Sequence, residues 1–340
     1  MKREIEQRLE ALCRKHGYAP YKMSRFEEYE LYVRNKDFLQ SDRVITFSGA
    51  DGRLLAMKPD VTLSIVKNAP EAPGALRKVH YRENVYRQDR DAGDFREILQ
   101  AGIECVGDVG SYEVAEVVYL AAKSLAALGT GTILSLSHVG LIRHALEESG
   151  LPRKQWDLAL ECLGQKRGQE LRHLCREHGA DEAMLLTLLR ARTIDDLASV
   201  AECEALGELR RTIALLDPGQ VRLDFSLGND MKYYSGLVFQ GYARGVPASV
   251  LSGGQYDRLL EHMGKKARAI GFAVYLDRLP ENRDDWDVDT LLLCGESDPG
   301  AILAAAEQLP GSVLAAKWEP ADRVWKRRAV LENGEVRYLD

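Results

Sequence analysis

The fold is decided by two stretches, which read Lys78-Val79-His80-Tyr81-Arg82-Glu83-Asn84-Val85-Tyr86-Arg87 and Glu97-Ile98-Leu99-Gln100-Ala101-Gly102-Ile103-Glu104-Cys105. We interpret them as a pair of strands on either side of a polar loop, Gln88 to Asp94. A second hairpin is predicted where residues 44–47 and 54–57 flank Gly49-Ala50-Asp51-Gly52. Because hairpins dominate residues 1–138 and regular βαβ alternation is missing, we expect a mainly antiparallel sheet in an α+β fold.

Helices are predicted to flank this sheet. Apolar residues recur at helical spacing over residues 3–16, and a second helix is expected over 111–128. Residues 140–216 carry helical patterns with little strand signal, which indicates a helical insertion. The sequence therefore predicts a core formed by residues 1–139 and 217–282, interrupted by an insertion at 140–216. A polar linker follows Pro280, and 283–340 are expected to form a short α/β region.

Composition excludes several classes of protein. The 340 residues are 45% hydrophobic and 29% charged, with a net charge of −6, which is ordinary for a globular protein and unlike collagen, disordered or membrane-spanning chains. The charged amino terminus lacks the apolar stretch of a signal peptide, so we expect a cytoplasmic protein. Six scattered cysteines form no CxxC pair, and reduced thiols are expected. We expect no metal site, because His173, Cys175 and His178 do not share one helical face.

Polar residues on the second strand pair are candidates for a binding site. Gln100 and Glu104 alternate with apolar residues and face the same side, as a polar pocket floor or as an exposed sheet face. Arg87 and Arg96 stand at the two ends of the loop. They would grip a phosphate or carboxylate in bidentate fashion, or lie on a solvated hairpin.

Four further segments carry weaker signals. In Lys58-Pro59-Asp60-Val61-Thr62, Asp60 or Thr62 would cap a helix, and Asp60 would equally suit an ammonium group. One of the adjacent Tyr233 and Tyr234 must face inward. Gly253-Gly254 is interpreted as a turn that enters a helix, and Arg278 follows an apolar strand.

The order of these motifs resembles histidyl-tRNA synthetase over residues 1 to about 282. The resemblance implies the class II synthetase fold, an antiparallel sheet flanked by helices and usually dimeric. In that family the arginine that matches Arg87 grips the ATP α-phosphate, and the one that matches Arg278 holds the ATP tail. Residues that line the family's histidine pocket match Asp60, Thr62, Gln100, Glu104 and Tyr234.

The sequence also departs from the synthetases. Asn229 stands where they carry an arginine that supports amino-acid activation, and asparagine supplies no fixed positive charge. Lys232 lies nearby with a different geometry. Ser24 replaces a usual proline, and Gln255 stands where arginine is typical. The region after residue 282 is also much shorter than a synthetase's anticodon-reading domain.

A pocket that keeps amino-acid contacts while losing catalytic charge resembles the regulatory subunit of ATP phosphoribosyltransferase. That resemblance implies a protein with no catalytic residues and no cofactor, a homodimer within a hetero-oligomer. It would activate a short catalytic subunit and transmit feedback by histidine, its effector. Lys58 departs from this family too, where arginine is usual. Two alternatives stay open: a divergent, truncated histidyl-tRNA synthetase that binds ATP, or a structural paralogue whose pocket binds nothing.

Overall fold

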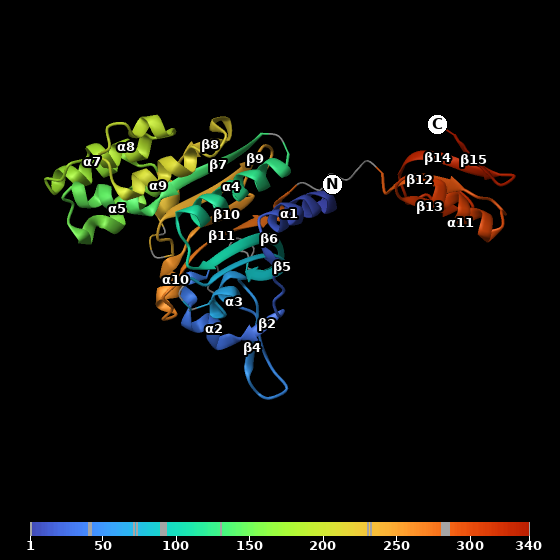
Figure 1. The fold of residues 1–340 in the computed structure, drawn as a ribbon, viewed down its shortest axis with the longest axis horizontal. Helices are drawn as coiled ribbons and strands as arrows, with labels where there is room; N and C mark the ends of the chain where they lie inside the picture. The colour runs from blue at the N-terminus through green and yellow to red at the C-terminus, as the bar shows by residue number, and fades with distance from the viewer. Residues whose placement is uncertain are drawn as a thin grey trace. The chain divides into compact units, whose positions relative to one another are not determined.

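The computed structural model describes residues 2–39, 43–70, 72, 74–88, 94–129, 131–229, 231, 233–279 and 286–339. The chain divides into two compact units, residues 1–280 and 281–340 (Figure 1). The first unit holds the predicted hairpins and helical region, and the second is a small α/β unit.

The first unit is built on a large sheet, which within the described residues has eight strands in the order β1-β5-β6-β11-β10-β9-β7-β8. Neighbouring strands are antiparallel except for β1–β5 and β7–β8, which are parallel. In spatial order the strands are Ala19–Pro20, Leu76–Gln88, Phe95–Gly107, Arg268–Tyr275, Leu251–Gln255, Leu237–Ala243, Thr132–His138 and Val221–Leu223. The expected mainly antiparallel sheet is therefore confirmed.

Alternation along the central strands divides the sheet into two faces. On one face, Ala101, Ile103 and Cys105 of β6 join a buried apolar cluster with α1 (Lys2–Lys15) and α4 (Ser111–Ala127). On the other face, Val79, Tyr81 and Val85 of β5 pack with α2 (Tyr29–Arg34), α3 (Thr62–Lys67) and α10 (Asp257–His262). A small sheet of β2 (Phe26–Glu28), β4 (Leu54–Met57) and β3 (Thr46–Ser48) extends this second layer.

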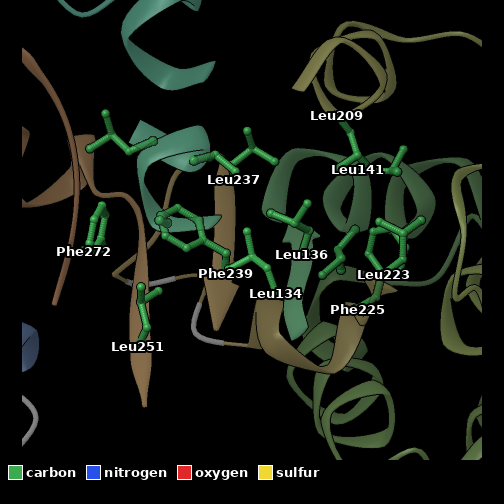
Figure 2. Packing of buried hydrophobic residues seen from close by; sticks show 14 of the residues in the cluster. Leu134, Leu136, Leu141, Leu209, Leu223, Phe225, Leu237, Phe239, Leu251 and Phe272 are labelled. Carbon is green, nitrogen blue, oxygen red and sulfur yellow. The ribbon is translucent and has the colours of Figure 1, made fainter. Parts of the chain in front are cut away.

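The helical region continues the same apolar cluster. Its helices are α5 (Val139–Glu148), α6 (Trp156–Gly164), α7 (Gly168–Glu177), α8 (Ala183–Arg190) and α9 (Glu204–Ile213). Figure 2 shows Leu141 of α5 and Leu209 of α9 beside Leu136 of β7. The sheet and these helices therefore share one core, so burying the helices' apolar faces also stabilises the far edge of the sheet.

The second unit has a four-stranded sheet, counted over the described residues, in the order β13-β12-β14-β15. Its elements are β12 (Val288–Leu293), α11 (Pro299–Gln308), β13 (Val313–Ala316), β14 (Trp325–Glu332) and β15 (Glu335–Tyr338). Asp298 caps α11 by accepting hydrogen bonds from Gly300 N and Ala301 N. The predicted hairpin at Asn333-Gly334 is confirmed, and both residues have positive φ, +52° and +82°, as a type I′ turn requires.

The interpretation of Gly253-Gly254 as a turn is wrong. Both glycines lie inside β10, paired with β9 and β11. A Cβ on Gly253 would come within 2.3 Å of Gly271 O, and one on Gly254 within 2.7 Å of the Tyr234 ring. Glycine is needed here because other groups approach the strand closely, not because the chain reverses.

Candidate functional site

The structure brings the strand, helix and tyrosine candidates together around one small cavity, with a volume of about 40 Å³. It lies on the α3 face of the sheet, where α3, β5, β6, β10 and β11 meet. Its lining includes the predicted residues Asp60, Thr62, Arg87, Gln100, Glu104, Tyr233 and Tyr234.

Glu104 lies at the centre of this pocket, and only 2% of the residue is exposed. Its carboxylate accepts hydrogen bonds from Thr62 Oγ1, at 2.8 Å, and from the Tyr256 hydroxyl. Burial raises the pKa of Glu104 to about 8, against the two hydrogen bonds, which lower it. Gly271 lies opposite Glu104 on β11, and a Cβ there would come within 1.8 Å of Glu104 Oε2. The missing side chain at 271 therefore makes room for the carboxylate.

Asp60 caps a helix, one of the two roles that its sequence context suggested, and its second oxygen faces an arginine. Its Oδ1 accepts a hydrogen bond from Leu63 N at 2.9 Å, which caps the first turn of α3. Its Oδ2 faces Arg87 Nη2 at 3.7 Å, and Arg87 Nε also donates to Pro59 O at 2.7 Å. Burial raises the pKa of Asp60, and the Arg87 charge opposes that rise. The pocket thus holds one buried carboxyl group, Glu104, one partly buried carboxyl group, Asp60, and one guanidinium.

Gln100 belongs to the pocket floor rather than to an exposed sheet face. It is buried on β6, on the same side as Glu104. Among the described residues, its Nε2 atom finds no hydrogen-bond partner. A buried amide donor without a partner is costly, and a ligand acceptor in the pocket would satisfy it.

Aromatic rings form the remaining wall. Tyr233 and Tyr234 both line the cavity, and their rings meet edge to face at 4.7 Å between centroids. Tyr81 and Tyr256, which the sequence analysis did not single out as site residues, line it too. The sequence offered one indirect signal for Tyr81, because the hairpin places it opposite Gly102. The missing side chain at residue 102 leaves room for the Tyr81 ring, since a Cβ there would come within 2.6 Å of the Tyr81 hydroxyl.

The other two candidate arginines lie apart from this pocket. Arg278 lines a neighbouring cavity of about 460 Å³, and the two cavities share Tyr233, Tyr234, Ser252 and Tyr275. Its Nη1 donates to Ser249 O at 2.6 Å, and its guanidinium stacks on Tyr275 at 4.1 Å. Arg96 is paired with Arg87 across the hairpin but is exposed, and it is not part of the pocket lining. The register nevertheless sets Arg96 directly opposite Arg87, so a shared phosphate contact stays a prediction.

Two of the departures, Gln255 from the synthetases and Lys58 from the regulatory subunits, have local explanations. Gln255 accepts a hydrogen bond from Leu237 N at 2.5 Å through Oε1 and so ties β10 to the start of β9. Lys58 is almost completely buried and pairs with Glu83. Asn229 ends a short 3₁₀ segment, and Lys232 lies outside the described residues.

The antiparallel sheet with helices on both faces and a polar pocket over its central strands has the fold of the class II aminoacyl-tRNA synthetases. A family model described as histidyl-tRNA synthetase matches residues 1–279. The chain therefore belongs to the histidyl-tRNA synthetase family, which confirms the resemblance inferred from the order of motifs.

Relatives within this family carry two different names. The ATP phosphoribosyltransferase regulatory subunit of Thermus thermophilus is 30% identical over 89% of this chain and 83% of that protein. The histidine–tRNA ligase of Archaeoglobus fulgidus is also 30% identical, over 82% of this chain and 71% of that protein. Sequence identity alone therefore does not decide between a regulatory subunit and a histidine–tRNA ligase.

Solved structures agree on the fold. A Bacillus halodurans protein described as ATP phosphoribosyltransferase regulatory subunit/histidyl-tRNA synthetase matches with a TM-score of 0.76 at 23% identity, covering 92% of this chain and 88% of that chain. A chain of the HisG:HisZ ATP phosphoribosyl transferase complex of Thermotoga maritima matches with a TM-score of 0.67 at 19% identity, covering 81% and 97%.

Among the described residues, no group of three or more histidine, cysteine or acidic side chains is placed to hold a metal ion. No helix in the described part of the chain has the length and apolar character needed to cross a membrane.

Proposed function

We propose that this chain is the regulatory subunit of an ATP phosphoribosyltransferase in histidine biosynthesis, and that it binds histidine in the pocket between Asp60 and Glu104. The observation that carries the proposal is a pocket equipped for an amino acid in a chain that has Asn229 where synthetases use an arginine. The Thermus thermophilus relative named as such a regulatory subunit supports it. A cytoplasmic setting and a homodimer within a hetero-oligomer are part of the same proposal.

The chemistry of the pocket suits histidine in three ways. Asp60 and Glu104 present carboxyl groups to an ammonium or imidazolium. Gln100 offers its unpartnered Nε2 to an acceptor on the ligand. Tyr234 supplies an aromatic wall. Because Glu104 has a pKa of about 8 in the protein alone, a cation that binds beside it would favour its ionised form and release a proton near neutral pH.

Entry of the ligand requires the pocket to widen. A volume of about 40 Å³ accommodates only a few water molecules. Arg87 is the group that must yield, because it faces Asp60 across the cavity. The ligand's ammonium would take the place of the guanidinium beside Asp60, so binding would exchange one ion pair for another. Movement of Arg87 would then be the local change that alters the arrangement of the complex.

The partner in this proposal is a short catalytic subunit of ATP phosphoribosyltransferase, as the name of the Thermotoga maritima HisG:HisZ complex suggests for a protein of the same fold. Histidine would favour one arrangement of the complex over another. Such a coupling is typically worth about 1–3 kcal/mol and acts equally in both directions. The catalytic subunit would therefore alter histidine affinity as much as histidine alters its activation.

The decisive experiment combines two assays on the purified chain. Histidine-dependent ATP–pyrophosphate exchange should stay at background in a folded sample. Calorimetry should detect histidine binding to the chain or to its complex with a short catalytic subunit, and Asp60→Asn should weaken it at least tenfold. If neither the chain nor the complex binds histidine, the proposed sensor role is wrong.

A truncated synthetase is the second candidate, favoured by Arg87 in the pocket and Arg278 in the adjoining cavity. The Archaeoglobus fulgidus histidine–tRNA ligase at 30% identity also supports it. Pyrophosphate exchange above background, abolished by Arg87→Gln, would establish this alternative and would mean that another group replaces the charge missing at Asn229.

A further inference from the structure

The two pocket tyrosines begin a short segment, residues 233–237, that runs beside the end of β10, and we call it the tyrosine segment. Two hydrogen bonds hold its middle residue, Ser235. Its main-chain N–H donates to Gln255 O at 2.9 Å, and its Oγ accepts a bond from Asp257 N at 3.2 Å. The position of the tyrosine segment therefore depends on the residues that end β10.

The side chain of Gln255 makes a further contact with the same segment. Only 2% of this residue is exposed, and its Oε1 accepts a hydrogen bond from Leu237 N at 2.5 Å. The amide also lies against Gly236, because a Cβ there would come within 2.1 Å of Gln255 Oε1. Without this side-chain carbonyl, Leu237 N would lose its acceptor in a buried place, which is costly.

Gln255 is not among the residues that line the proposed histidine pocket. Its neighbours Gly254 and Tyr256 line that pocket, whereas Gln255 lines a separate cavity of about 510 Å³ together with Ser235 and Gly236. Alternate residues at the end of β10 thus face two different cavities. Gln255 can act on the histidine pocket only through the tyrosine segment.

Tyr234 is the wall residue that depends on this arrangement. Its ring packs on Gly254, where a Cβ would come within 2.7 Å of the ring, and it meets the Tyr233 ring at 4.7 Å between centroids. Tyr234 directly precedes Ser235 in the chain. A shift of the segment would therefore tilt the Tyr234 ring in a cavity of only about 40 Å³.

We propose that Gln255 is a positioning residue of the histidine pocket, and that its side-chain carbonyl fixes the Tyr234 ring by holding the tyrosine segment against β10. This inference rests on the proposed function. A wall that is already in place lowers the ordering cost of binding, so Gln255 raises histidine affinity without touching the ligand. Arginine, which is typical of synthetases at this position, has no acceptor to offer Leu237 N.

Calorimetry with histidine on the full-length protein tests this role. Gln255→Met keeps the length of the side chain and removes the acceptor, and it should weaken histidine binding about fivefold or more. Gln255→Glu keeps an acceptor oxygen and should stay within about twofold of the wild type. Gln165→Met makes the first exchange at an exposed position of the helical region and should leave the affinity unchanged. A residue that only stabilised the fold would change the unfolding midpoint and not the Kd of the folded molecules.

A second measurement follows the pocket wall without any ligand. In protein labelled with ¹³C-tyrosine, the ring resonances of Tyr234, assigned with Tyr234→Phe, should move in Gln255→Met. Amide hydrogen exchange at Leu237 should accelerate about tenfold in the same variant. Both observations should return to wild-type values in Gln255→Glu, because the acceptor is restored.

The inference is wrong if Gln255→Met binds histidine as tightly as the wild type, or if its Tyr234 resonances are unchanged. If the wild type itself binds no histidine, the proposed function fails. The Tyr234 resonances and the exchange at Leu237 then decide the role of Gln255 alone, and unchanged values would overturn it. If Gln255→Met does not fold by circular dichroism, Ser235→Ala decides instead. It removes the bond from Asp257 N and should move the Tyr234 resonances, and unmoved resonances would contradict the inference.

Discussion

The two faces of strand β6 differ sharply although both come from the same 13 residues. Gln100, Gly102 and Glu104 point to the α3 face and form a polar pocket floor, whereas Ala101, Ile103 and Cys105 point to α1 and α4 and join the main apolar cluster. The difference shows that the two faces of one strand can serve different purposes. The apolar face stabilises the fold, and the polar face carries buried polar groups that lower its stability. Substitutions on the two faces should therefore have separable effects.

The largest effect is expected on the apolar face. Ile103→Ala removes a fully buried side chain, and we predict a loss of about 2–5 kcal/mol in the free energy of unfolding. Urea titration would report it as a lower midpoint with an unchanged slope. A loss below about 1 kcal/mol would mean that this face is not the one that holds the fold.

Glu104 gives the opposite face a pH dependence. Its ordinary pKa of 4.5 applies to the unfolded chain, and burial raises it to about 8 in the fold. Because the folded pKa is higher, the folded chain holds the extra proton between these values. The Glu104 contribution is fully present below about pH 4.5 and is lost as the pH rises through 8. Between pH 5.5 and 7.5 its contribution should fall by up to about 1.4 kcal/mol per pH unit.

Measuring unfolding of the wild type and Glu104→Gln over that pH range isolates this dependence, since all other groups cancel in the difference between the two slopes. The wild type should lose stability faster than Glu104→Gln as the pH rises. Equal slopes would indicate that the carboxyl group is already ionised in the folded chain.

A smaller effect is expected at Thr62. Thr62→Val keeps the shape of the side chain and removes the 2.8 Å hydrogen bond to Glu104. We predict a loss of about 1 kcal/mol and a further rise in the Glu104 pKa, because the bond favours the charged carboxylate. NMR titration of the Glu104 side chain would follow the pKa, and a downward shift would contradict this assignment of the bond.

No loss of stability is expected at Gln100. Gln100→Met removes a buried amide donor that has no partner in the described part of the structure, so the free energy of unfolding should not fall and should rise by up to about 1 kcal/mol. Histidine affinity should nevertheless fall at least tenfold if the proposed function is correct. A large loss of stability would instead mean that the amide serves the fold.

Part of the pocket could be predicted from the sequence. Strict alternation along residues 97–105 placed Gln100 and Glu104 on one face, because side-chain period in a strand is fixed. The class II fold rested on the resemblance to a family rather than on periodicity. Gly253-Gly254 was misinterpreted, since a glycine pair is as typical of close packing as of a turn, and only the neighbouring strands β9 and β11 decide between them.

Other features depended on tertiary structure alone. The bond from Tyr256 to Glu104 joins residues 152 positions apart, so no local pattern indicates it. The burial of His80 depends on where α1 lies over the sheet. Arg96 was grouped with Arg87 because both flank the same loop, yet it is exposed and outside the pocket lining.

If the pocket binds a cation as proposed, the ion pair between Arg87 and Asp60 affects the concentration at which the cation binds. Any cation that enters must compete with an internal one that is always present at the same site, so the observed dissociation constant equals the intrinsic constant divided by the fraction of molecules with the pair open. A substitution at Arg87 that strengthens or weakens this pair would shift the working concentration range and leave Asp60, the proposed contact to the ligand, in place. Affinity would then be adjusted separately from selectivity.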